Sequence, residues 1–280
     1  MKASYSLVHL TNALCPPPEL IRTAAQAGFD CVSLRSIPTR MRRNVQSVQE
    51  SVTGKMPFAL ADDKQLLRET REAARSEGIV IHDTENARIF DGVDVRDYER
   101  DLEAAAELGI REILTNIWTE DSAFYEEAFA RLCELAAPYG QNINLEFVTW
   151  SGVMGLGDAV RLLQKTGRPN QGIVLDTLHF YRSRNTTGEL KGLPEQWFRY
   201  VHLCDCPAEI PESREELIQT GLAGRLFPGE GAVDIRGILD CLPPVVRGIE
   251  APNPERMAES GFLAYVTEAL RRTKQYLGEE

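Results

Sequence analysis

Hydrophobic positions follow two different periods along this chain. Short runs of apolar and often β-branched residues, such as Ile173 to Leu175, are typical of strands that are buried on both faces. Between these runs, apolar residues recur every three or four positions, as at Leu20, Ala24 and Ala27, which predicts helices. The predicted strands start near residues 5, 30, 79, 111, 143, 172, 200 and 245.

The regular alternation of strand and helix predicts an α/β fold, a single-domain (β/α)8 barrel that spans residues 1–280. No linker or change in composition divides the chain. Two long links, 36–62 and 206–232, are expected to lie over the barrel mouth, and the third strand is expected to run from Ile79 to His82. A doubly wound open sheet is the alternative, but no glycine-rich phosphate turn follows an early strand.

The composition of the chain argues against nucleic acids and membranes as binding partners. A net charge of −11 disfavours nucleic acid and anionic membrane surfaces, because both need a basic face. Six cysteines show no disulfide framework, and no signal peptide or membrane-spanning run is evident, so the cytoplasm is the expected location. The expected partner is a small molecule, and a homo-oligomer is left open.

Four consecutive strands, the fifth to the eighth, each carry an acidic or imidazole side chain near the carboxyl end. These residues are Glu146, Asp176, His202 and Glu250. Because the carboxyl ends of barrel strands meet at one mouth, we expect the four side chains to converge. Three carboxylates and one imidazole suit a single divalent ion, Mn²⁺ or Mg²⁺ first, with Co²⁺ or Zn²⁺ as alternatives. Taken singly, each could equally be a salt-bridged residue at a strand end.

An ion at this site would make the proton beside a substrate carbonyl acidic, which predicts an enediolate mechanism. Glu146 and Glu250 could then act as acid and base from two sides of the substrate. His179 could contact a substrate oxygen or orient Asp176, and Arg225 could hold a substrate oxygen or form a salt bridge. The other half of the mouth is left to shape the substrate pocket, with these residues at its strand ends: His9, Arg35, Glu85 and Trp118.

Several of these stretches resemble one known family, the xylose isomerase-like (β/α) barrels grouped as sugar phosphate isomerases and epimerases. The stretches that carry the resemblance are NLEF at Glu146, LDTLH at Asp176 and His179, VHLCD at His202, RLFPGEG at Arg225 and GIEAP at Glu250. The resemblance implies that Glu146, Asp176, His202 and Glu250 bind one divalent ion, commonly Mn²⁺. It also implies that the two glutamates are acid and base, and that His179 and Arg225 contact substrate.

The resemblance leaves the reaction open. The first hypothesis is an isomerase or epimerase that acts on a ketose or related hydroxy ketone. The second is a dehydratase of the inosose or 3-dehydroshikimate type, and the third is a metal-binding barrel without turnover. The apurinic endonucleases of this fold use a histidine-rich three-metal cluster and a basic surface, and four histidines with a net charge of −11 depart from that pattern.

Overall fold

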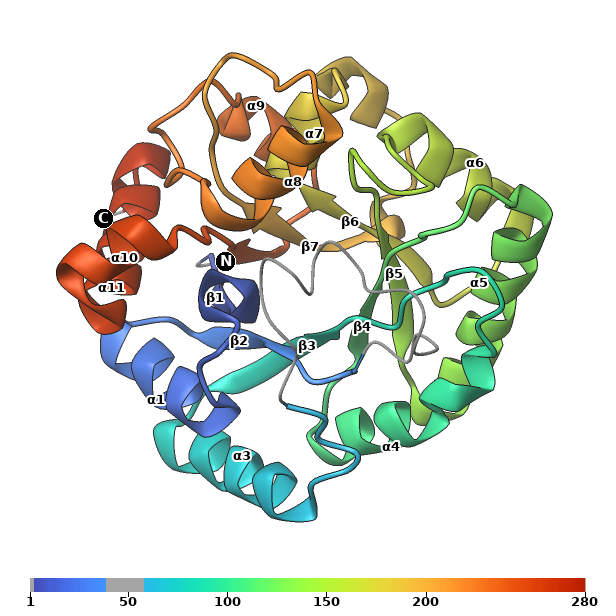
Figure 1. The fold of residues 1–280 in the computed structure, drawn as a ribbon, viewed down its shortest axis with the longest axis horizontal. Coiled ribbons are helices and arrows are strands. Elements are labelled where there is room, and N and C mark those ends of the chain that lie inside the picture. Colours follow the sequence, from blue (N-terminus) through green and yellow to red (C-terminus); the bar gives the residue numbers. More distant parts are fainter. Residues whose placement is uncertain (1–2, 39–57, 280) are drawn as a thin grey trace.

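The strands of this chain form a closed parallel barrel. The computed structural model describes residues 3–38 and 58–279, and within them the strands pair in sequence order until β8 returns to β1. Figure 1 looks down this barrel, with the helices forming a ring outside it. The strands are β1 (Tyr5–Val8), β2 (Cys31–Arg35), β3 (Val80–Glu85), β4 (Glu112–Thr115), β5 (Asn142–Glu146), β6 (Gln171–Asp176), β7 (Phe198–Leu203) and β8 (Val246–Ile249). The predicted (β/α)8 barrel is therefore confirmed.

Helices lie between the strands, as the alternation predicts, and one of them falls in the link at 206–232, where no helix was predicted. They are α1 (Pro17–Ala27), α3 (Lys64–Glu77), α4 (Glu99–Glu107), α5 (Ser122–Ala136), α6 (Leu156–Thr166), α7 (Thr177–Arg182), α8 (Arg214–Ala223), α9 (Ile235–Leu239), α10 (Pro254–Ser260) and α11 (Phe262–Leu277). Gly28 ends α1 with φ of 88°, a left-handed conformation that glycine adopts without a Cβ clash.

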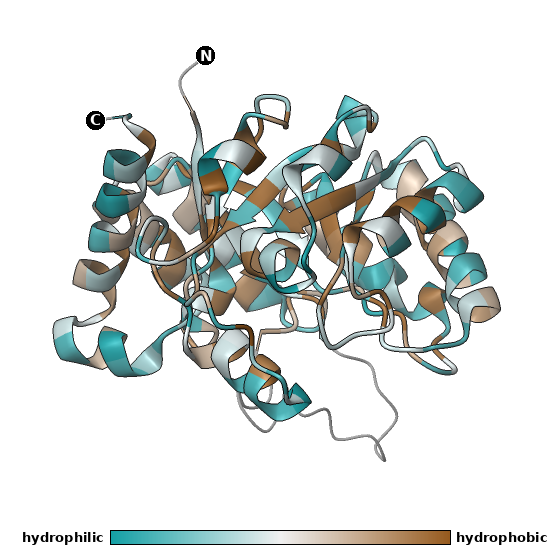
Figure 2. Ribbon diagram, turned by 90° about the horizontal axis from the view of Figure 1, so that it is seen from above, coloured by the Kyte–Doolittle hydropathy of each residue, from teal (hydrophilic) through white to brown (hydrophobic). Residues whose placement is uncertain are grey.

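The main hydrophobic core lies between the strands and the surrounding helices. It includes Leu20 and Ile21 of α1, Phe129 of α5 and Val266 of α11, all of which are buried. Figure 2 shows apolar strands at the centre and helices that are polar on their outer sides. Among the described residues, no helix combines the length and apolar character needed to cross a membrane.

The third strand is longer than predicted. It continues past His82 to Glu85, because the polar side chains of Asp83 and Thr84 find partners inside the sheet. Ser33 donates to Asp83 Oδ2 over 2.5 Å, and Thr84 donates to the Leu34 carbonyl over 3.1 Å. These hydrogen bonds offset the cost of burying polar groups, which the hydrophobic pattern alone does not reveal.

The described residues include all of one predicted long link and only the ends of the other. The link at 36–62 falls largely on residues 39–57, which lie outside the described residues. The link at 206–232 contains the helix α8, with Ser213 as its N-cap. Gly221 of α8 lies so close to the Trp150 ring that an added Cβ would be 2.5 Å from it, so α8 packs tightly against the β5 side of the mouth.

Candidate metal centre and substrate pocket

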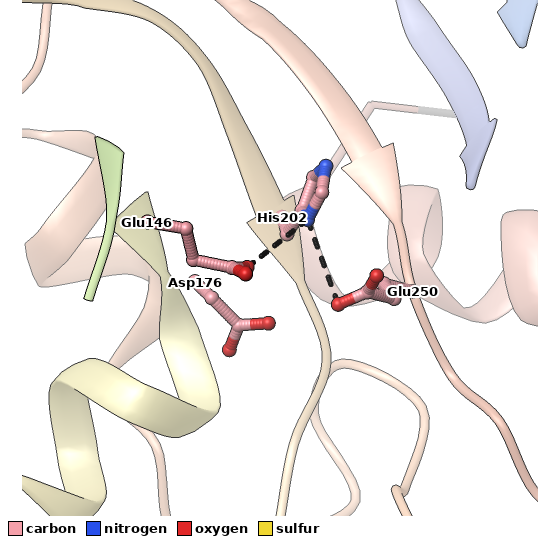
Figure 3. A group of neighbouring side chains, drawn as sticks. All are labelled: Glu146, Asp176, His202 and Glu250. Carbon is pink, nitrogen blue, oxygen red and sulfur yellow. Dashed lines mark ion pairs between the residues drawn. The ribbon is translucent and has the colours of Figure 1, made fainter. Parts of the chain in front are cut away.

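The four predicted ligand residues converge at the carboxyl ends of β5 to β8. Glu146 and Asp176 are the last residues of β5 and β6, His202 lies in β7, and Glu250 follows β8. One ligand atom from each residue can be chosen so that all lie within 4.8 Å of one another. Figure 3 shows the four side chains pointing toward a shared space. This spread is close to the about 4 Å that separates opposite ligands of a small divalent ion.

His202 is the clearest sign that this cluster suits a cation. Its Nδ1 lies 3.6 Å from Glu146 Oε1 and 3.5 Å from Glu250 Oε2 (Figure 3). Neither ring nitrogen makes a hydrogen bond within the described part of the chain, although the residue is 1% exposed. Buried polar atoms without partners are rare in folded proteins, and a missing ligand is one recognised cause.

Glycine in β8 makes room for this imidazole. A Cβ on Gly248 would lie 3.0 Å from His202 Cδ2 and 2.8 Å from Val8 Cγ2. Real Cβ atoms essentially never come as close as 2.8 Å, and 3.0 Å is already tight, so a larger residue would press on both Val8 and the His202 ring. Gly248 therefore helps to set the position of His202.

The four side chains carry more negative charge than the chain itself neutralises. Arg225 Nη1 lies 2.6 Å from Asp176 Oδ2 and 2.8 Å from Glu250 Oε2, and its Nε donates to the Gly221 carbonyl over 2.7 Å. When His202 is neutral, as a metal ligand must be, three carboxylates and one guanidinium leave a net charge of −2, and a proton on His202 reduces it to −1. A buried net charge of this size is strongly unfavourable unless a divalent cation offsets it.

The pKa values respond to this excess of negative charge. Burial acts to lower the pKa of His202, but the carboxylates of Glu250 and Glu146 outweigh it and raise that pKa well above the usual value. Burial, joined by the Glu250 carboxylate, raises the pKa of Glu146. Burial acts in the same direction on Asp176, but Arg225 outweighs it and holds the pKa of that carboxyl well below its usual range. Asp176 is therefore firmly ionised.

Two asparagines that no sequence pattern singled out hold Glu146 in place. Asn116 Nδ2 donates to Glu146 Oε2 over 2.9 Å and to the Glu146 carbonyl over 3.1 Å. Asn86 Nδ2 in turn donates to Asn116 Oδ1. This relay holds one carboxylate oxygen of Glu146, while Oε1 lies on the His202 side.

The structure separates the roles left open for Arg225 and His179. Arg225 forms the salt bridge of the two alternatives, yet it also lines the cavity, so substrate contact stays a prediction. The backbone N–H groups of Leu178 and His179 donate to Asp176 Oδ1 over 2.8 and 3.1 Å. The main chain of α7, rather than the imidazole, thus orients Asp176.

The His179 ring lies against Trp150 and lines the cavity. The ring centroids are 4.9 Å apart in an edge-to-face arrangement, and Nδ1 is 3.3 Å from Thr149 Oγ1. Burial lowers the pKa of His179 to about 3, although Asp176 acts to raise it. The imidazole is therefore neutral at physiological pH.

The β1 to β4 half of the mouth contains a balanced ion pair. Arg35 Nη1 donates to Glu85 Oε2 over 2.8 Å, and both side chains are 4% exposed. Burial raises the pKa of Glu85 to about 7, although Arg35 acts to lower it. His9 lies behind this pair: its Nδ1 accepts from the Arg35 N–H over 3.0 Å, and its Nε2 faces the Cys15 carbonyl at 2.7 Å. Of the residues predicted to shape the pocket, His9 thus acts by holding the Arg35 backbone.

One cavity of about 30 Å³ joins the two halves of the mouth. Glu146, Glu250, Arg225 and His179 line it on the side of the predicted metal centre. Its remaining lining residues are Leu10, Arg35, Glu85, Asn86, Asn116, Trp118, Val148, Trp150 and Leu222. A volume of this size is about the share of one water molecule in liquid water.

An apolar cluster lies beside this cavity. It joins Leu10, Val148 and Trp150 with Ile218 and Leu222 of α8. Leu10, Val148, Trp150 and Leu222 also line the cavity, so apolar side chains shield the polar residues from solvent.

The closed parallel barrel and the acidic cluster at its mouth place the chain among the (β/α)8 barrels that have a candidate metal centre. The model of the family described as "Xylose isomerase-like TIM barrel" matches residues 21–259, and the chain belongs to this family. The family resemblance seen in the sequence is thereby confirmed.

Relatives in this family include enzymes with different reactions. The chain is 24% identical to a 3-dehydroshikimate dehydratase of Pseudomonas aeruginosa over 96% of its own length and 40% of that protein. It is 28% identical to an inosose dehydratase of Halalkalibacterium halodurans over 45% of the chain and 46% of that protein. An inosose isomerase of Bacillus subtilis is 25% identical over 58% of the chain and 61% of that protein. The chain thus spans about half the length of these relatives.

Solved structures agree on the fold. The IolI protein, whose structure is described as having a bound zinc atom, superposes with a TM-score of 0.75 at 18% identity, covering 98% of this chain and 99% of IolI. The 3-keto-D-glucoside 4-epimerase YcjR of E. coli gives a TM-score of 0.68 at 15% identity, covering 98% of this chain and all of that one (100%). These likenesses show the fold.

Proposed function

We propose that this chain is a divalent-metal-dependent isomerase or epimerase that acts on a ketose or related hydroxy ketone. The observation that carries the proposal is the placement of Glu146 and Glu250. They come from β5 and from the segment after β8, lie within 3.6 Å of the same His202 nitrogen, and both line the cavity. Two carboxylates placed in this way can reach one substrate carbon from different sides.

The residues present fit a divalent cation, with Glu146, Asp176, His202 and Glu250 as its ligands. Support comes from the excess of negative charge, which is −2 when His202 is neutral, and from the two ring nitrogens of His202, which lack hydrogen-bond partners among the described residues. Such an ion, when bound, would withdraw charge from a substrate carbonyl oxygen and make the neighbouring C–H proton acidic. Mn²⁺ is the first candidate, and Mg²⁺, Co²⁺ and Zn²⁺ can be ligated by the same atoms.

Glu146 and Glu250 divide the proton transfers. One carboxylate removes the proton beside the carbonyl, giving an enediolate, and the other delivers a proton to the opposite face or to the adjacent carbon. Asn116 keeps Glu146 Oε2 engaged, so Oε1 is the oxygen left to exchange the proton. Leu10, Trp150 and Leu222 exclude water, which preserves the reactive enediolate, and they must separate to admit a substrate larger than the cavity of about 30 Å³.

A dehydratase is the second candidate, and two of the sequence relatives support it. A 3-dehydroshikimate dehydratase and an inosose dehydratase are among the proteins similar to this chain. Dehydration shares the first proton abstraction but needs an acid that protonates the departing hydroxyl group. The lowered pKa of His179, about 3, makes its imidazolium too scarce at neutral pH to supply that proton. His179 is therefore not the acid that a dehydratase would need.

Proton exchange in heavy water tests the proposal. Mn²⁺-loaded protein is incubated with a panel of ketoses, keto-inositols and 3-dehydroshikimate, and products are analysed by mass spectrometry and NMR. We expect deuterium uptake beside the carbonyl with an unchanged elemental composition. Loss of water would establish the dehydratase instead, and no exchange with any ketone would contradict both.

Glu146→Gln provides the matched variant. The amide keeps the shape of the side chain but cannot accept the proton, so exchange should fall by about 10² to 10⁴. Glu230→Gln is the control, because Glu230 pairs with Arg256 and Arg272 away from the cavity. Unchanged exchange in Glu146→Gln would contradict the role of Glu146 as acid or base.

A further inference from the structure

The β2 to β4 side of the cavity has polar atoms that no function assigned so far uses. They belong to Arg35, Glu85, Asn86 and Trp118, all of which line the cavity opposite the predicted ligands. We propose that these residues form a second binding site, which takes two neighbouring hydroxyl groups at the end of the substrate remote from the metal. This proposal rests on the proposed function, since it assigns the far end of the same substrate.

The Arg35–Glu85 pair uses only part of its hydrogen-bonding capacity. One hydrogen bond joins Nη1 to Oε2, while Arg35 Nε and Glu85 Oε1 are buried and have no partner among the described residues. An unpartnered buried donor or acceptor costs about 1 to 3 kcal/mol. A hydroxyl group can accept from Arg35 Nε and donate to Glu85 Oε1, which would remove both costs at once.

Asn86 and Trp118 repeat this combination of donor and acceptor. Asn86 gives its amide nitrogen to Asn116, which leaves Oδ1 buried without a partner, and Trp118 Nε1 is likewise buried without one in the described ranges. Together with the ion pair, the wall offers two donors and two acceptors. This is the complement of two hydroxyl groups, each of which donates once and accepts at least once.

Charge distinguishes hydroxyl groups from a carboxylate at this site. Arg35 is paired with Glu85, and Arg225 with Asp176 and Glu250, so each arginine that lines the cavity already has an acidic partner. A substrate carboxylate here would approach Glu85 without an uncompensated cation to receive it. The site therefore selects a neutral, hydroxylated end over a carboxylated one.

Binding of a polyol that cannot react tests the proposal separately from the proposed reaction. Mn²⁺-loaded parent and variants are titrated by calorimetry with myo-inositol, which has hydroxyl groups but no ketone, and with shikimate, whose ring carries hydroxyl groups and a carboxylate. The parent should bind myo-inositol more tightly than shikimate. Failure of ketone exchange would leave this result intact, because myo-inositol binding involves no proton abstraction.

Trp118→Phe and Arg35→Lys are the informative variants. Phenylalanine keeps an aromatic ring but lacks the indole N–H, and lysine keeps the charge but lacks the Nε–H of the guanidinium. Each should weaken myo-inositol binding by about tenfold. Metal content, measured by elemental analysis, should stay equal to that of the parent, as it should in the Glu230→Gln control.

Glu85→Gln reverses the preference. Loss of the carboxylate leaves Arg35 as an unpaired cation, so shikimate should gain affinity relative to myo-inositol. Parent-like myo-inositol affinity in both Trp118→Phe and Arg35→Lys would overturn the proposal. So would tighter binding of shikimate than of myo-inositol by the parent, or no binding of myo-inositol at all.

Discussion

The two halves of the barrel mouth differ in how their charges are balanced. In the β5 to β8 half, one guanidinium pairs with two of the three carboxylates, Asp176 and Glu250, and His202 has no hydrogen bond within the described residues. In the β1 to β4 half, Arg35 and Glu85 form a one-to-one pair. The excess negative charge marks a cation site, whereas the balanced pair with spare hydrogen-bonding atoms marks a site for neutral hydroxyl groups.

The pKa values of two buried histidines, one in each half of the mouth, show the same difference in charge balance. Burial, joined by the nearby Arg35, lowers the pKa of His9 to about 4, and the hydrogen bond with the Cys15 carbonyl opposes this only in part. The pKa of His202 is raised because two carboxylates outweigh burial. Similar burial thus gives opposite protonation states, and the neighbouring charges decide which one occurs.

The largest expected contrast comes from the same substitution made in each half. Glu250→Gln removes a proposed acid or base and a metal ligand, so deuterium exchange should fall by about 10² to 10⁴. Glu85→Gln should change substrate affinity by about tenfold and leave metal content intact. Exchange rates, Michaelis constants and metal content of both variants check this, and equal losses of exchange would erase the distinction between the halves.

The next effect concerns stability and pH in the β1 to β4 half. The folded-state pKa of His9, about 4, lies below its unfolded value, so the unfolded state binds a proton first and stability falls as the pH drops below 6.5. His9→Asn removes this contribution, which amounts to about 2 to 3 kcal/mol between pH 7 and pH 4.5. Urea unfolding across this range should show a flatter pH profile for the variant, and parallel profiles would refute a neutral buried His9.

A smaller effect is expected from the glycine behind His202. Gly248→Ala places a Cβ against Val8 and His202, which should cost about 1 to 3 kcal/mol and displace the imidazole. We expect weaker Mn²⁺ binding in titrations followed by electron paramagnetic resonance. Gly221→Ala, which crowds Trp150 instead, is the control, and parent-like Mn²⁺ affinity in Gly248→Ala would argue against His202 as a ligand.

The smallest expected effect is the dependence of Mn²⁺ affinity on pH. Because the raised pKa keeps His202 protonated without an ion, each ion that binds must displace a proton. Mn²⁺ affinity should therefore rise about tenfold per pH unit below that pKa. Calorimetry in buffers of different ionisation enthalpy measures the proton release, and binding without released protons would conflict with ligation through the imidazole.

The sequence predicted the barrel because its eight apolar runs and the helical periods between them are regular. It predicted too short a third strand, since Asp83 and Thr84 are polar and their burial depends on partners in β2. It also missed α8, whose apolar residues cover the mouth rather than the main core.

The sequence also could not predict those site residues whose role depends on partners in neighbouring strands. The four predicted ligand residues could be selected because each stands near a strand end, and the structure brings them together. Asn116 and Asn86 could not be selected, because an amide that supports a carboxylate from a neighbouring strand leaves no local pattern. Their roles depend on which strands are adjacent in space.

Metal stoichiometry of Asp176→Ala tests the central claim most directly. Parent and variant are stripped with a chelator, loaded with Mn²⁺, desalted and analysed for metal and protein. We predict one ion per chain in the parent and almost none in the variant, because water cannot replace a firmly ionised carboxylate at equal affinity. One ion per chain in both proteins would contradict a metal centre built from these four strand ends.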